Sequence, residues 1–260
     1  DATSTTTSAV TNNECVETVL HRRPPGDLSG RIALVTGAGC PIGESTVEIL
    51  RKRGAIVLVH GGRSKKHSDA FYGDLSDIST VQTIATTLKN NSLMPDILIC
   101  LAGGNNIDRK GIDDALGMHA DDALSLFNIN FITALLCSQQ FVPTMVDRKW
   151  GRVITVASCV LGMPRPEGRC AAYAAAKGAL AEWTKCLAVQ VIKSGVTVNC
   201  VAPSSTRPLP HNSETLQRYA YPHEIAEVIC FLASAESSYC SGEVIRVHGG
   251  NIRDQSCLIT

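Results

Sequence analysis

The stretch that most constrains the fold is segment 32–60, where two apolar runs flank a glycine-rich turn and a helix-forming segment. Ile32–Val35 has the apolar character of a buried strand. The turn Thr36–Gly43 follows it, and helix-forming residues extend from about Glu44 to Arg53. A second buried strand is predicted over Ile56–His60. Together these pieces predict a βαβ unit, which joins two parallel strands through a crossover helix.

The rest of the chain continues this alternation of strands and helices. Further strands are predicted over 71–72, 96–100, 153–156, 196–201 and 244–247, and helices over about 77–89, 120–146, 173–193 and 223–233. The pattern predicts an α/β fold: a single Rossmann-like, doubly wound domain with a seven-stranded parallel sheet and helices on both faces. The first residues are rich in Thr, Ser and Asn, so we expect 1–27 to be a flexible N-terminal extension and 28–260 the Rossmann domain.

Three polar side chains are predicted to meet near the end of the strand 153–156. Ser158 lies just beyond that strand, and Tyr173 and Lys177 are four residues apart in an Ala-rich helical segment. This spacing places the phenol and the ammonium on one helical face. A nearby cation stabilises a phenolate and lowers the tyrosine pKa, which makes the phenol a usable general acid or base. These three side chains together are suited to adding a proton to a carbonyl oxygen or removing one from an alcohol.

Composition argues against several classes of partner. The 24 basic and 24 acidic residues give a formal net charge of zero, so we expect no nucleic-acid binding. Apolar runs are interrupted well before about 18 residues, so no membrane span is expected. The chain has eleven cysteines, an odd number, and no Cys-x-x-Cys pair, which favours buried thiols in a reducing, cytoplasmic compartment. Its histidines show no metal-ligand spacing, so no metal is predicted.

A glycine turn between the first strand and its helix is typical of dinucleotide binding, because the free N–H groups at the start of the helix favour a pyrophosphate. The segment after the second strand then indicates which dinucleotide is bound. No Asp or Glu ends that strand to bind the two ribose hydroxyls. Arg63 and Ser64 follow it instead and could hold a 2′-phosphate. Solvation alone could also account for a charged loop here, but the pattern favours NADP(H) over NAD(H).

The order of these pieces resembles the short-chain dehydrogenase/reductase family, in its classical branch, over about residues 28–250. The resemblance rests on a glycine turn, an adenine-contacting Asp, an Ala-Gly loop, the helix carrying an Asn, the Ser, Tyr and Lys, and a strand that leads to the nicotinamide. In this chain they are Thr36–Gly43, Asp74–Leu75, Cys100–Gly103, Phe127–Asn130, Ser158, Tyr173, Lys177 and Val198–Pro203.

The resemblance implies hydride transfer between NAD(P) and a carbonyl/alcohol pair. By it, Tyr173 is the acid/base, Ser158 orients the substrate oxygen, Lys177 binds the nicotinamide ribose, and Asn130 anchors a water of a proton relay. It also implies a homotetramer or homodimer, built through the Asn130 helix, the Tyr173 helix and the last strand. The cofactor-binding residues that it implies, together with the two that follow the second strand, are Gly37, Gly39, Cys40, Ile42, Arg63, Ser64, Asp74, Leu75, Ala102, Gly103, Tyr173, Lys177, Pro203 and Thr206.

Departures from the family pattern border the cofactor site. Pro41 replaces a glycine of the phosphate turn and offers no N–H to an anion. Leu101 replaces an Asn that braces the sheet, and Ser204 replaces a Gly beside the nicotinamide. Pro208 stands where a Thr that binds the nicotinamide carboxamide is common, and Thr206 could take over that role. The segment 203–224 is about a dozen residues shorter than the usual substrate-covering lid, which would leave the pocket more open.

These observations favour an NADPH-dependent reductase acting on a carbonyl or imine of a bulky small molecule. Two alternatives remain open at this point. One is an enzyme that uses the same scaffold for non-redox chemistry such as cyclisation, cycloaddition, isomerisation or elimination, and the other is a catalytically silent binding protein.

Overall fold

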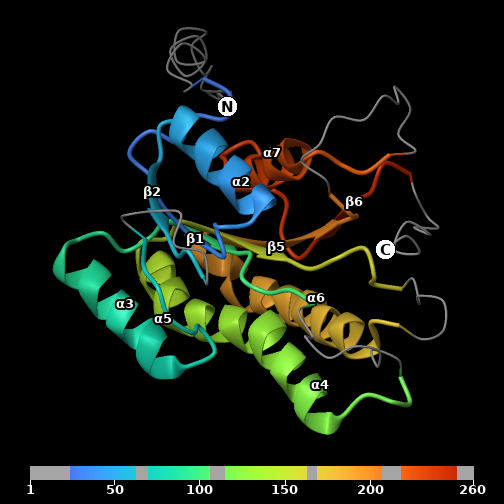
Figure 1. The fold of residues 1–260 in the computed structure, drawn as a ribbon. Coiled ribbons are helices and arrows are strands. Elements are labelled where there is room, and N and C mark those ends of the chain that lie inside the picture. Colours follow the sequence, from blue (N-terminus) through green and yellow to red (C-terminus); the bar gives the residue numbers. More distant parts are fainter. Residues whose placement is uncertain (1–23, 63–69, 106–114, 163–168, 207–217, 251–260) are drawn as a thin grey trace, which may run out of the picture.

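A computed structural model describes residues 24–62, 70–105, 115–162, 169–206 and 218–250. Strands and helices alternate through the chain, as predicted (Figure 1). The strands are β1 (Ile32–Thr36), β2 (Ile56–Val59), β3 (Ile97–Cys100), β4 (Gly151–Val156), β5 (Val196–Pro203) and β6 (Val244–Val247). The helices are α2 (Pro41–Lys52), α3 (Ile78–Asn90), α4 (Ala120–Phe127), η1 (Asn128–Ile132), α5 (Thr133–Asp147), α6 (Ala171–Val191), η3 (Ile192–Ser194) and α7 (Pro222–Leu232).

All six strands are parallel and stand in the order β2-β1-β3-β4-β5-β6. The chain moves outward from β1 to β2 and then crosses back to place β3 on the other side of β1. The order of the strands therefore reverses between β1 and β3. Ligands of open α/β sheets bind at the carboxyl ends of the strands beside such a reversal.

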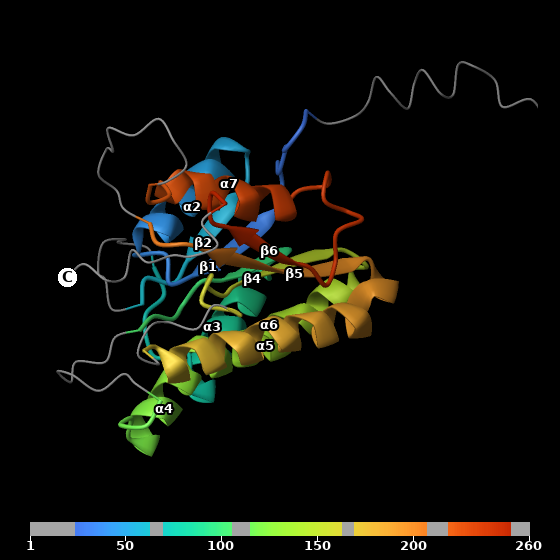
Figure 2. The ribbon, with the colours of Figure 1, turned by 90° about the vertical axis from the view of Figure 1, so that its right-hand side faces the viewer.

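Helices cover both faces of the sheet, so its strands are buried on both sides. Figure 2 shows α2 and α7 on one face and α3, α5 and α6 on the other. Alternate residues of β1 serve the two layers: Ala33 and Val35 pack toward α2 and α7, and Leu34 packs toward the opposite layer. Phe141 and Met145 of α5 are buried in that second layer. Each such side chain contributes about 2–3 kcal/mol through its removal from water.

The predicted seventh strand at 71–72 is wrong within the part of the chain that the structure describes. Phe71 makes a single parallel bridge to His60, with its N–H donating to Val59 O (2.8 Å) and its carbonyl accepting from Gly61 N (3.0 Å). Gly73 then adopts a φ of +127° and turns the chain away from the sheet. One bridged residue is too short a run to continue the ladder.

The single helix predicted over 120–146 is divided by the π-helical turn η1. Within η1, the Asn130 amide nitrogen donates to Leu126 O (2.9 Å). In a regular α-helix that carbonyl would accept from the backbone N–H of residue 130, so the side chain replaces part of the helical ladder. By length and composition the whole run 120–147 could span a membrane, but it packs along the sheet as a core helix of this fold.

The predicted N-terminal extension 1–27 lies mostly outside the described residues, which begin at residue 24. From Pro24 onward the chain contacts the domain: the Gly26 N–H donates to Glu236 Oε1 (2.8 Å) and the Leu28 N–H to Arg53 O (2.7 Å).

Candidate active site

The turn after β1 lies against the loop after β3, backbone to backbone. A Cβ added to Gly37, whose φ is +65°, would lie 2.7 Å from the Ala102 Cα. Thr36 fastens the two segments: its hydroxyl donates to Ile99 O (3.2 Å) and accepts from the N–H groups of Leu101 and Ala102 (3.1 and 3.2 Å). The chain therefore needs glycine at position 37 to bring both loops to the same edge of the sheet.

Helix α2 begins at the proline that departs from the family pattern. Pro41 is the first helical residue, where the N–H that it lacks would have no partner within the helix. Cys40 is the N-cap, and its sulfur accepts from the Gly43 N–H (3.4 Å). A Cβ on Gly43 would lie 2.6 Å from the Ala38 Cα, so the helix packs closely on the turn. The proline is thus compatible with a helix that starts at the carboxyl end of β1.

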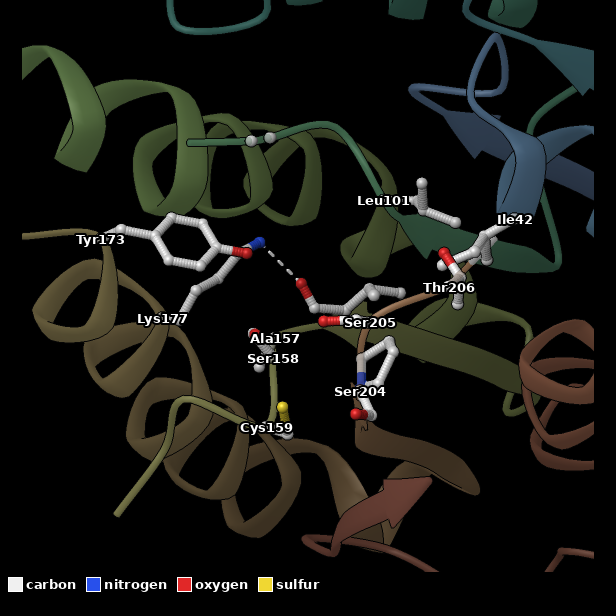
Figure 3. A pocket seen from close by; sticks show the side chains of 14 residues that line it. Ile42, Leu101, Ala157, Ser158, Cys159, Tyr173, Lys177, Ser204, Ser205 and Thr206 are labelled. Carbon is white, nitrogen blue, oxygen red and sulfur yellow. Dashed lines mark hydrogen bonds between the residues drawn. The ribbon is translucent and has the colours of Figure 1, made fainter. Parts of the chain in front are cut away.

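Tyr173 and Lys177 stand one turn apart on α6, as the spacing predicted. The Lys177 Nζ lies 5.9 Å from the centroid of the Tyr173 ring and donates to Val156 O at 2.7 Å (Figure 3). The lysine is only 3% exposed. Burial lowers its pKa from the ordinary 10.5 to about 8, because a desolvated ammonium is costly. The amine is therefore held in place and remains mostly protonated at pH 7.

Ser158 follows β4 and faces the same cavity as Tyr173 (Figure 3). Its loop is fixed by backbone bonds, since the Cys159 N–H donates to Pro203 O (2.8 Å) and the Leu161 N–H to Ser158 O (3.3 Å). The Ser158 hydroxyl also accepts from the Val160 N–H (3.4 Å). These contacts tie the serine to the end of the adjacent strand β5.

Asn130 is fully buried behind the cavity and braces the loop after β3. Its amide oxygen accepts from the Gly104 N–H and its amide nitrogen donates to Gly104 O, both at 2.9 Å. Gly103, with a φ of +149°, lies between the two polar groups: a Cβ there would lie 2.5 Å from Asn130 Oδ1 and 3.2 Å from Lys177 Nζ. Asn130 thus supports the wall of the site from inside the protein.

A cavity of about 270 Å³ gathers most of the predicted catalytic group. Its lining includes the predicted Ile42, Gly103, Ser158, Tyr173, Lys177, Pro203 and Thr206. Gly104, Cys159 and Ser205, which were not predicted as site residues, also line it, together with the departures Leu101 and Ser204. Figure 3 shows Leu101, Ile42 and Thr206 at one side and Tyr173 with Lys177 at the other. The hydroxyl-rich run Ser204–Thr206 was the available sequence signal for Ser205.

Six other predicted cofactor residues of the described part do not line this cavity: Gly37, Gly39, Cys40, Asp74, Leu75 and Ala102. Asp74 begins a turn in which its Oδ1 accepts from the Ser76 N–H (2.8 Å) and hydroxyl (2.7 Å), and Leu75 is buried. Arg63, Ser64 and Pro208 lie outside the described residues.

The arrangement fits a dinucleotide. Gly37, Gly43 and Gly103 allow close packing at the carboxyl edge, because a Cβ on each would lie 2.5–2.7 Å from a protein atom. The amino end of α2 faces that edge, where helix N–H groups favour phosphate. The buried amine of Lys177 and the hydroxyls of the cavity supply donors for a ribose.

Comparisons with known proteins agree with this fold. The model of the family described as short chain dehydrogenase matches residues 31–218. A 3-oxoacyl-acyl-carrier-protein reductase FabG of Rickettsia bellii is 32% identical over 248 residues, covering 86% of this chain and 98% of the relative. The oxidoreductase UcpA of Salmonella typhimurium is 30% identical over 267 residues, covering 90% and 99%.

A solved structure from Agrobacterium tumefaciens, described as that of a candidate gluconate dehydrogenase, shares the fold. Its TM-score is 0.77 at 23% identity, over 89% of this chain and 99% of that one. The chain is therefore a Rossmann-fold protein of an oxidoreductase family. It belongs to the short-chain dehydrogenase/reductase family, as the sequence motifs predicted.

Proposed function

We propose that this chain is an NADP(H)-dependent oxidoreductase that interconverts a carbonyl, or an imine, with the corresponding alcohol or amine on a bulky small molecule. The observation that carries the proposal is the meeting of Ser158, Tyr173 and Lys177 in one cavity at the carboxyl edge of the sheet. The names of the relatives, a reductase and an oxidoreductase, favour redox chemistry over the non-redox alternative.

In the proposed reaction, each residue of the group has a separate role at the oxygen atom of the substrate. The nicotinamide would supply or accept the hydride. Tyr173 donates a proton to the substrate oxygen during reduction, and the Ser158 hydroxyl hydrogen-bonds the same oxygen and orients it. The positive charge of Lys177, 5.9 Å from the ring centroid, stabilises the phenolate that remains. Asn130 holds the Gly103–Gly104 wall against this group.

The cofactor would be held by three groups of residues along the carboxyl edge of the sheet. In the proposal Gly37, Gly39, Cys40 and Ile42 approach the phosphates, Asp74 and Leu75 the adenosine, and Ala102, Gly103, Pro203 and Thr206 the nicotinamide half. Arg63 and Ser64, which lie outside the described residues, would hold the 2′-phosphate, and this expectation from the sequence is the reason for preferring NADP(H).

The test uses a tyrosine variant and an isotopic label. Wild type is incubated with a panel of ketones, including an acetoacetyl thioester, and NADPH that carries deuterium at C4. We expect deuterium in the alcohol product, and loss of at least about 10³-fold in turnover in Tyr173→Phe, which still binds NADPH. Unchanged turnover in Tyr173→Phe would refute the assigned role.

We further propose a cytoplasmic homodimer or homotetramer. No disulfide joins any of the nine cysteines of the described residues, which suits a reducing compartment. The assembly is proposed from the family resemblance, which implies contacts through the Asn130 helix and the Tyr173 helix; on these, Leu124 is 62% and Val189 78% exposed. Sedimentation equilibrium would give the state, and a monomer at micromolar concentration would contradict the proposal.

A further inference from the structure

A buried histidine joins two segments at the outer end of the proposed cofactor site. His60 directly follows β2 and is 3% exposed. Its backbone bonds the turn after β1 as well, since its carbonyl accepts from the Ala38 N–H (3.0 Å) and its N–H donates to Val35 O (2.9 Å). The backbone position of the imidazole is therefore fixed by the glycine turn itself.

The side chain of His60 reaches the segment that follows β2. Its Nε2 lies 3.0 Å from Gly73 O. A carbonyl only accepts, so Nε2 carries the proton and donates. The other ring nitrogen, Nδ1, is buried and has no hydrogen-bond partner among the described residues. The bond to Gly73 is thus the single polar anchor of the ring within the described part of the chain.

The carbonyl that receives this bond belongs to the peptide that leads into Asp74. Gly73 has a φ of +127°, and a Cβ there would lie 2.7 Å from Thr80 Cγ2, so the turn is closely packed on α3. On its other side, the Asp74 carboxylate accepts from the Ser76 N–H and hydroxyl. The peptide 73–74 is consequently held by His60 at its carbonyl and by Ser76 at the next side chain.

We propose that His60 is a positioning residue for the adenosine half of the cofactor: by donating to Gly73 O it fixes the turn that presents Asp74. This inference rests on the proposed function, in which NADP(H) binds with Asp74 at the adenosine end. The histidine touches neither substrate nor the reacting atoms and acts through the turn alone.

Two amide variants each mimic one of the two ring nitrogens of His60. The amide nitrogen of His60→Gln can occupy the place of Nε2 and retain the bond to Gly73. The shorter side chain of His60→Asn matches Nδ1 and does not reach Gly73. Both variants are similar in polarity, so a difference between them reports the bond and not the loss of a ring. His60→Ala replaces the Asn variant if circular dichroism shows that the latter is unfolded.

The readouts are equilibrium binding of NADPH and of the fragment adenosine 2′,5′-bisphosphate, and hydrogen exchange of segment 71–75 without ligand. We expect His60→Asn to bind both ligands about tenfold more weakly than wild type and to exchange faster at 71–75, and His60→Gln to stay within about threefold. Wild-type affinity for both ligands in the folded Asn or Ala variant overturns the inference.

The hydrogen-exchange arm distinguishes this inference from the proposed function. If wild type binds neither ligand, the proposed function fails. In that case faster exchange at 71–75 in His60→Asn alone still supports His60 as the anchor of the turn, and unchanged exchange overturns that role too.

Discussion

Gly103→Ala tests the construction of the active-site wall. The added Cβ would lie 2.5 Å from Asn130 Oδ1, an atom that already accepts from the Gly104 N–H at 2.9 Å. Asn130 is 0% exposed and its amide nitrogen is bonded to Gly104 O and Leu126 O, so its amide cannot move without breaking hydrogen bonds. The same added Cβ would lie 3.2 Å from Lys177 Nζ, so the new methyl group cannot move away from Asn130 toward the lysine.

The expected loss follows from these contacts. Alanine at a φ of +149° costs about 1–2 kcal/mol in backbone strain, and displacing the Asn130 amide loses two hydrogen bonds at about 1 kcal/mol each. We therefore expect the free energy of unfolding to fall by roughly 3 kcal/mol, with a Tm lower by about 6–12 °C. Turnover should fall about 100-fold, because Asn130 and Lys177 both move.

Urea unfolding, a thermal melt and initial rates measure this effect, and Gly30→Ala is the control. Gly30 also has a positive φ, +77°, but no atom lies within 4 Å of its added Cβ, so this variant reports backbone strain alone. The reasoning is refuted if Gly103→Ala is as stable as Gly30→Ala and retains wild-type turnover.

Four further predictions concern charge and packing. Because burial lowers the pKa of Lys177 to about 8, its ammonium is lost as pH rises through 8, and turnover should fall above that pH in a pH–rate profile. Between pH 8 and 10.5 the unfolded lysine binds more protons than the folded one, so this group makes wild-type stability rise with pH, and Lys177→Met should remove that slope from urea midpoints. Arg218 lowers the pKa of Glu224 to about 2, so Glu224 stabilises the fold above pH 4.5 and loses that effect as pH falls through 2. Since the carboxylate is 34% exposed and its charge is screened, Glu224→Gln should cost about 1 kcal/mol and lower the Tm by about 2–4 °C at pH 7. Trp150 lies 3.6 Å below the Arg31 guanidinium and 4.6 Å from that of buried Arg152, at the amino end of β4, so Trp150→Leu should lose about 1–2 kcal/mol in urea unfolding with unchanged turnover.

Local pattern was sufficient to predict most of the fold. Buried strands such as Ile97–Cys100 are continuous apolar runs, and Tyr173 and Lys177 needed only helical spacing to meet. The prediction of a strand at 71–72 failed because strand formation there depends on the residue that follows. Gly73 turns the chain away after one bridged residue. Apolar character alone does not report such an interruption.

Long-range contacts account for what the sequence did not predict. The π turn at Asn130 depends on side-chain bonds to Leu126 and to Gly104, which is 26 residues away. Ser205 lines the cavity because β5 ends beside β4, and His60 contacts Gly73 across a segment with no periodic signal. In each case the partner is brought close by the fold and cannot be found from spacing along the chain.

The measurement that tests the central claim most directly is a titration of the purified protein with NADPH and with NADH, followed by nicotinamide fluorescence. The account predicts micromolar or tighter binding of NADPH and binding of NADH that is at least about tenfold weaker, about 1.4 kcal/mol. Binding of neither cofactor would contradict the account, because it would leave Tyr173 and Ser158 without a hydride donor beside them.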